Sequence, residues 1–266
     1  MKLFAIADLH LGHPANREAL GRLAPHPEDW LIVAGDVGET EAHLDEAFAV
    51  LGQRFAKLIW VPGNHELWTT QRGGGALRGE AKYRALTELA RAHGVVTPED
   101  SYPRWPGDGR TVIVPMFLLY DYSFRPDEVA ADQVLAWADG TICADEVLLD
   151  PDPYPTRPAW CAARVDATRE RLARLPTDLA TVLVNHFPLE QHHAHLPAIP
   201  RFSPWCGTSA TAGWHRRFRA RAVVYGHLHL RREFVEDGVR FHEVSLGYPR
   251  QWDQGKPLEA YLRRIL

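Results

Sequence analysis

The chain has 266 residues, which is enough for one large α/β domain or two small ones. Its hydrophobic share of 45% and charged share of 24% are those of an ordinary globular protein and exclude a disordered one. A formal net charge of -4 excludes a global basic field that would draw the chain to nucleic acid.

Short apolar runs recur along the chain, and most of them stop at a polar cluster. Such runs predict strands that are buried on both faces of a sheet. A further run, residues 239–244, alternates between apolar and polar side chains and is expected to form an edge strand. The six buried runs are residues 3–7, 30–34, 58–61, 112–114, 181–184 and 222–225.

Stretches with helical spacing lie between these runs. Residues 41–54, 80–93 and 162–175 each place apolar side chains at the spacing of a helix with one buried face. Gly94 follows the second stretch and Pro176 the third, and both residue types favour the end of a helix. The alternation of strands and helices predicts an α/β fold.

Two long stretches interrupt this alternation. Residues 120–160 are rich in aromatic, acidic and proline residues, and residues 191–214 hold three histidines, several prolines and two tryptophans. Loops of this length in a compact domain are usually functional. We therefore expect a single domain over residues 1–266, with insertions at about 120–160 and 191–214 that shape the substrate site.

The cysteine content indicates a reducing compartment. Cys143, Cys161 and Cys206 are odd in number and form no CxxC pair, so neither a disulfide framework nor a cysteine zinc site is expected. The first residues lack the apolar region of a signal peptide, and no apolar run reaches the roughly 18 residues of a membrane helix. We expect a cytoplasmic protein without a membrane contact.

Candidate metal ligands stand at the ends of five of the predicted strands. Ligands collect at the carboxyl ends of strands in α/β sheets, so these side chains are expected to meet. Carboxylate and amide oxygens are hard donors, and imidazole suits zinc, iron and manganese. Each residue alone reads as a turn or core residue, but together they predict a metal site. In chain order they are Asp8, His10, Asp36, Asn64, His186, His227 and His229.

A set of five ordered motifs resembles that of the calcineurin-like metallophosphoesterases, over residues 8–229. The resemblance implies the fold of that family, a β-sandwich of two mixed sheets flanked by helices in α/β/β/α layers. It also implies a metal-dependent phosphatase or phosphodiesterase. The motifs are Asp8-x-His10, Gly35-Asp36, Gly63-Asn64-His65-Glu66, the single His186 and Gly226-His227-x-His229.

The resemblance implies two divalent metal ions, which would be manganese, iron or zinc. A hydroxide that bridges the two ions would attack phosphorus in line. The ligands divide between the ions in a way that the resemblance also implies. Asp8, His10 and His229 would bind one ion, Asn64, His186 and His227 would bind the other, and Asp36 would bridge them.

Catalytic roles follow from the same resemblance. His65 would donate a proton to the leaving alkoxide, and Glu39 would orient its ring. Asn64 would help to neutralise charge on the phosphoryl oxygens. Further side chains near the ligand loops are candidates for phosphate contact, although each also fits an ordinary surface position. They are His13, Arg17, Arg72, His192, His193 and His195.

The expected reaction is the hydrolysis of phosphomonoesters or phosphodiesters, with a phosphorylated small molecule or a nucleotide as the substrate. Thr40 stands where the protein phosphatase branch has an arginine, which disfavours a phosphoprotein. A nuclease acting on DNA or RNA ends is the alternative enzyme, because residues 8–12 resemble the first motif of double-strand-break repair nucleases. A non-catalytic metal-binding interaction scaffold is the alternative of another class. It is disfavoured because every ligand and His65 are present.

Overall fold

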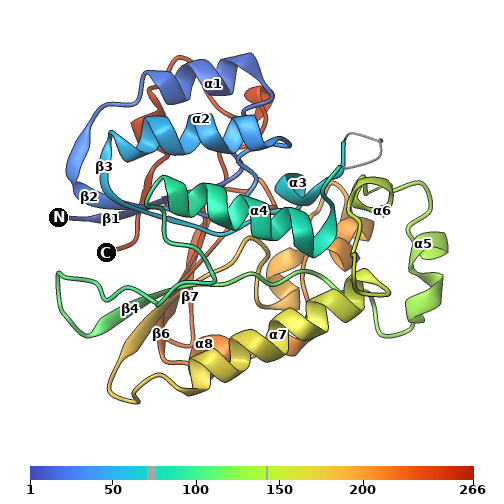
Figure 1. Cartoon of the computed structure of the whole chain (residues 1–266). Helices are drawn as coiled ribbons and strands as arrows, with labels where there is room; N and C mark the ends of the chain where they lie inside the picture. Colours follow the sequence, from blue (N-terminus) through green and yellow to red (C-terminus); the bar gives the residue numbers. More distant parts are fainter. Residues whose placement is uncertain (71–75, 142) are drawn as a thin grey trace.

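The first sheet has four strands, three from the N-terminal part of the chain and one from its C-terminal end, in a computed structural model that describes residues 1–70, 76–141 and 143–266. The strand order is β3-β2-β1-β9. β1 (Leu3–Ile6), β2 (His26–Val33) and β3 (Phe55–Trp60) run parallel, and β9 (Arg263–Arg264) pairs antiparallel with β1. The two ends of the chain therefore lie side by side (Figure 1).

The second sheet has five strands, which lie between residues 111 and 243, in the order β4-β5-β6-β8-β7. Its parallel members are β4 (Thr111–Pro115), β5 (Ala180–Val184), β6 (Ala220–Tyr225) and β8 (Val239–Glu243). β7 (Glu233–Glu236) pairs antiparallel with β8. Both sheets are therefore mixed.

Apolar side chains from both sheets form one buried layer between them. Because each strand is also covered on its outer face, the strands carry apolar residues on both sides, which explains the unbroken apolar runs in the sequence. The carboxyl ends of parallel strands from both sheets therefore reach a shared edge. Members of this layer include Ala5, Ile32, Ile59, Ile113, Val182 and Val224.

Helices cover the outer face of the first sheet. α1 (Pro14–Gly21) and α2 (Glu41–Gly52) lie above the strands in Figure 1, and α4 (Gly79–Ala92) lies below α2, at the height of β1. The side chain of Thr40 accepts a hydrogen bond from His43 N and so caps the start of α2. The buried face of α2 consists of Leu44, Ala47, Phe48 and Leu51. These side chains pack into the hydrophobic cluster between the helices and the first sheet.

The outer face of the second sheet is covered by α7 (Arg157–Ala173) and α8 (Trp214–Arg217), which lie below the strands in Figure 1. None of the helices in the described parts of the chain is long and apolar enough to cross a bilayer. Short elements complete the chain: α3 (Asn64–Leu67), α5 (Val134–Trp137), α6 (Asp145–Leu148), η1 (Ala131–Gln133), η2 (Gln191–Ala194), η3 (Pro200–Trp205), η4 (Ser209–Thr211), η5 (Pro249–Gln251) and η6 (Leu258–Tyr261).

The predicted fold class, two mixed sheets flanked by helices, is confirmed, and two details of the prediction are wrong. β8 is an inner strand, because it pairs with β6 on one side and with β7 on the other. Its alternation reflects Arg240, whose side chain leaves the sheet and donates to the carbonyl of Ile265. α7 begins at Arg157 rather than at residue 162, because the Thr156 side chain accepts from Ala159 N and caps the helix there.

Candidate metal centre

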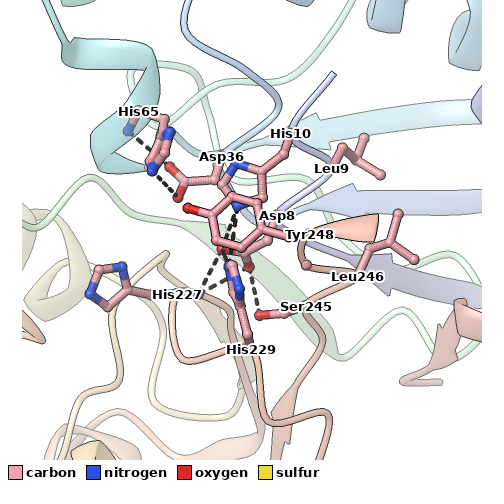
Figure 2. Close-up of polar contacts among 12 residues, drawn as sticks. Asp8, Leu9, His10, Asp36, His65, His227, His229, Ser245, Leu246 and Tyr248 are labelled. Atoms are coloured by element: carbon pink, nitrogen blue, oxygen red, sulfur yellow. Dashed lines mark hydrogen bonds and ion pairs between the residues drawn. The ribbon is translucent and has the colours of Figure 1, made fainter. Parts of the chain in front are cut away.

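Seven polar side chains from five strand ends converge at the shared edge of the two sheets. Asp8 and His10 follow β1, and Asp36 follows β2. The other four follow strands β3, β5 and β6, and they are Asn64, His186, His227 and His229. Figure 2 shows several of these side chains around a common centre. Six of them appear in the groups of His, Asp and Glu side chains that could hold a metal ion.

The backbone at this edge adopts an unusual conformation. The φ angles are 54° at Asp8, 43° at His10, 53° at Asp36, 70° at His227 and 54° at His229. Non-glycine residues rarely adopt positive φ, because the Cβ atom then crowds the neighbouring carbonyl oxygen. Such strained positions gather at functional sites, where they aim side chains. Five such residues lie at this edge of the sheets, which indicates a functional site.

The first group of ligand atoms consists of Asp8, His10 and His229. His229 Nε2 lies 3.0 Å from Asp8 Oδ1 and 3.2 Å from His10 Nε2. Gln251 Oε1 accepts a hydrogen bond from Tyr248 N at 2.7 Å and lies 2.8 Å from His229 Nδ1. His229 Nδ1 therefore donates to Gln251, and the lone pair of Nε2 faces the Asp8 carboxylate. Facing lone pairs repel unless a proton or a cation lies between them.

The second group consists of Asp36, His186 and His227. His186 Nδ1 donates to the carbonyl of Ala34 at 2.9 Å. Its Nε2 consequently faces Asp36 Oδ2 at 3.4 Å and Asn64 Oδ1 at 3.2 Å, both of which are acceptors. His227 Nε2 is buried and has no hydrogen-bond partner among residues 1–70, 76–141 and 143–266. These nitrogen and oxygen atoms therefore form a second set of electron-pair donors that could bind a cation.

The protonation of the histidines is consistent with cation binding. Burial lowers the pKa of His10 to about 4 and that of His227 to about 3, so both rings are neutral and present a lone pair. Burial alone would lower the pKa of His186, but Asp36 raises it to about 10. Its proton occupies the place that a cation can take, and the set of carboxylate, amide and imidazole donors suits manganese, iron or zinc. The side chains therefore fit divalent metal ions.

His65 lies beside this centre, and its ring forms a third candidate group with His10 and Asp36, whose ligand atoms lie within 4.8 Å of one another. Its backbone N–H donates to Asp36 Oδ1 at 2.9 Å, and its Nδ1 lies 3.3 Å from Glu39 Oε1. The ring stacks on Trp68 with 3.7 Å between centroids. Burial would lower the pKa of His65, but Asp36 and Glu39 raise it to about 9. The hydrogen bond from His65 in turn lowers the pKa of Glu39 to about 2. In this structure the ring is therefore an imidazolium at neutral pH.

The buried Glu66 carboxylate joins two of the ligand loops. Its Oε2 accepts from Asp36 N at 3.0 Å and from Gly63 N at 2.9 Å, and its Oε1 accepts from Val37 N at 2.9 Å. Burial and the nearby Asp36 raise the pKa of Glu66 to about 7. Glu66 belongs to the third sequence motif, but its role as a clamp for backbone amides was not predicted.

We expect Glu66→Gln to lower the free energy of unfolding by about 1–3 kcal/mol, because the glutamine NH₂ would face the N–H of Val37 and leave a buried donor unsatisfied. Urea unfolding of the metal-free protein measures this change. Glu18→Gln is the matched control and should change stability by no more than about 0.5 kcal/mol, since Glu18 is exposed and forms an ion pair with exposed Arg22. Equal stability of the two variants would contradict the role of Glu66.

Asp145 supports the centre from the first insertion, and sequence reasoning missed it. Its Oδ1 accepts from Asn64 Nδ2 at 2.9 Å and from Trp68 Nε1 at 2.6 Å. These bonds fix the Asn64 amide so that its oxygen faces His186. Asp145 is fully buried, and burial raises its pKa. Nothing in the local sequence distinguishes it from the other acidic residues of the insertion.

We expect Asp145→Leu to weaken metal binding by about 10–100-fold, the usual effect of removing a group that orients a ligand. The Asn64 amide would then be free to turn its NH₂ toward the cation. Asp145→Asn should bind metal more tightly than Asp145→Leu, because its carbonyl oxygen can still accept both hydrogen bonds. Manganese titration of the three proteins measures the affinities. Identical affinities for all of them would contradict a positioning role.

The candidate phosphate contacts fall into different surroundings. His13 is exposed, and its ring lies 5.5 Å from that of Tyr248, which stacks on His10. Arg17 pairs with Glu46 at 3.2 Å. Arg72 lies outside the described residues. His192 and His193 both contact Glu236, and His195 is exposed. The structure therefore brings none of the described candidates into the two groups above, and their contact with a substrate stays a prediction.

Comparison with known proteins agrees with the site. The family model for calcineurin-like phosphoesterases matches residues 1–231. The chain is 51% identical over 269 residues to the acyl-carrier-protein phosphodiesterase PptH of Mycobacterium tuberculosis, covering 99% of this chain and 83% of that protein. A crystal structure of phosphopantetheinyl hydrolase (PptH) from the same organism matches with a TM-score of 0.93 at 50% identity, covering 100% of this chain and 95% of that one. The chain thus belongs to the calcineurin-like phosphoesterase family, as predicted, and is a phosphoesterase.

Proposed function

We propose that this enzyme hydrolyses the phosphodiester that joins a phosphopantetheinyl group to an acyl carrier protein. The observation that carries the proposal is the 51% identity, over 99% of the chain, to a phosphodiesterase named for that carrier protein. The similar solved structure is named for hydrolysis of the phosphopantetheinyl group. This substrate replaces the expected free small molecule or nucleotide with a phosphorylated group attached to a protein.

A dinuclear centre is the second part of the proposal. Asp36 supports it, because its carboxylate belongs to one group with His10 and His65 and to another with His186 and His227. One ion would lie among Asp8, His10 and His229, the other among Asn64, His186 and His227, and Asp36 would contact both. Divalent cations bound there, whether manganese, iron or zinc, would polarise the phosphoryl oxygens and activate water.

The chain itself supplies the proton for the leaving group. His65 holds a proton on a ring that Glu39 and Trp68 fix in place. Its Nε2 lies 3.8 Å from Asp36 Oδ2, so the proton is held next to the proposed bridging carboxylate. We assign it to protonation of the oxygen on the carrier-protein side of the broken bond. We also assign to Asn64 a part in neutralising charge on a phosphoryl oxygen, through the amide hydrogen that is not bonded to Asp145.

Mass spectrometry of the intact carrier protein tests this function. Phosphopantetheinylated acyl carrier protein is incubated with the enzyme and manganese, and we expect the carrier protein to lose the whole phosphopantetheinyl group. Bis(p-nitrophenyl) phosphate, a small diester, is assayed in parallel. Hydrolysis of this compound with an unchanged carrier protein would contradict the proposed substrate while leaving the phosphoesterase intact. A phosphate left on the carrier protein would contradict the proposed bond.

A further inference from the structure

A second group of histidines and a carboxylate lies apart from the two groups of the phosphoesterase centre, where η2 meets the edge strand β7. Candidate ligand atoms of His192, His193 and Glu236 all lie within 4.8 Å of one another. His192 Nε2 lies 2.8 Å and His193 Nε2 lies 2.7 Å from the same oxygen, Glu236 Oε2. Two imidazoles directed at one carboxylate oxygen form the donor set of a His₂Glu metal site.

His193 is fixed in this position before any ligand binds. Only 3% of its side chain is exposed, and its ring packs edge-on against Phe234 and Phe241, with 4.6 Å between centroids in each case. Its backbone carbonyl accepts a hydrogen bond from Arg232. Its Nδ1 is buried without a partner in the part of the chain that the structure describes. Nε2 is therefore the one ring atom with a polar contact there, and it is directed at Glu236.

A supporting layer of polar residues stands behind the group. His215 and Asp237 form a further candidate group with Glu236, and His215 Nε2 lies 3.0 Å from Asp237 Oδ2. Glu190 Oε1 lies 2.9 Å from His215 Nδ1 and also accepts from Gly213 N at 2.7 Å. A carboxylate that orients an imidazole from behind is a regular feature of metal sites. Candidate donors thus continue from Glu236 to Asp237 and His215 at this end of β7.

We propose that His192, His193 and Glu236 bind one zinc ion or a similar divalent cation, separately from the phosphoesterase centre. Imidazole nitrogen and carboxylate oxygen are donors that zinc prefers, and water can complete the coordination. The ion would tie η2 to β7. Phe202 lies in the same 191–214 segment and stacks on His227, with 5.7 Å between centroids. The bound ion would therefore restrict the motion of the 191–214 segment, which contacts His227 at the candidate metal centre.

Zinc counting tests this site without use of a substrate. The metal-free protein is equilibrated with zinc, passed through a desalting column and analysed for bound metal. We expect His192→Ala and Glu236→Gln each to retain one equivalent less than the wild type. His195→Ala is the matched control, because it removes an exposed histidine from the same loop and should retain the wild-type amount. The side chain of His192 is 61% exposed, so its removal should leave the fold intact.

Equal retention by all four proteins would overturn the proposal and leave ordinary hydrogen bonds to Glu236 as the explanation. Zinc-edge anomalous diffraction provides a second measurement on the wild type. A peak within bonding distance of His192 Nε2 and His193 Nε2 would support the site, and its absence in zinc-soaked crystals would overturn it. Neither result depends on which phosphodiester the enzyme hydrolyses.

Discussion

Asp36→Asn is expected to lower the rate of phosphodiester hydrolysis by about a thousandfold or more. Asp36 is the carboxylate shared by two of the ligand groups, and the positive histidines around it hold its pKa well below the ordinary range against the effect of burial. Asparagine would remove a negative charge that screens two cations from each other. A dinuclear centre contributes several kcal/mol to the transition state, and each 1.36 kcal/mol changes the rate tenfold.

Steady-state kinetics with manganese and the metal content of the purified variant measure this effect together. Asp166→Asn is the matched control, because Asp166 is an exposed residue that pairs with Arg169 on α7. Its activity should equal that of the wild type. If Asp36→Asn retained two metal ions and reached within tenfold of the wild-type rate, Asp36 would not be the bridging ligand.

His65→Gln is expected to lower kcat for the phosphopantetheinylated carrier protein by about 10²–10⁴, the usual contribution of a general acid. Glutamine keeps polarity and approximate size but cannot protonate an alkoxide. The loss should be much smaller for bis(p-nitrophenyl) phosphate, because nitrophenolate leaves readily without a proton. The metal content should not change, since His65 is not one of the proposed ligands of either ion.

Comparison of the two substrates is the decisive measurement for His65. His93→Gln, which removes a histidine that pairs with Asp45 on the surface, is the control and should leave both rates unchanged. An equal loss on both substrates would show that His65 organises the centre instead of serving as the acid. Loss of metal from His65→Gln would lead to the same conclusion.

The sequence was informative about the site because its ligands are local features. Each follows a short apolar strand, and residues such as Asp8 and His10 stand two positions apart on one strand end. The order of these motifs was enough to identify the family. Parallel strands bring their carboxyl ends to one edge, so the convergence of Asp36 with His186 follows from the fold class.

Supporting residues could not be predicted, because they reach the centre only through tertiary structure. Asp145 lies 81 positions from Asn64, and Gln251 lies 22 positions from His229. Neither stands in a recognisable motif. Short elements escaped because they lack an apolar run: β9 consists of two arginines, and β7 has two apolar residues between two glutamates. The substrate also left no local signal: Thr40 in place of an arginine disfavoured only a phosphoprotein, and the short, mildly acidic chain disfavoured only a nuclease.

Anomalous diffraction at the manganese edge tests most directly whether these strand ends hold a pair of cations. We predict two manganese peaks that share contact with Asp36, one also within bonding distance of Asp8 and His229 and the other of His186 and His227. Crystals grown with saturating manganese that showed no peak in contact with Asp36, or a single ion there, would contradict the dinuclear centre.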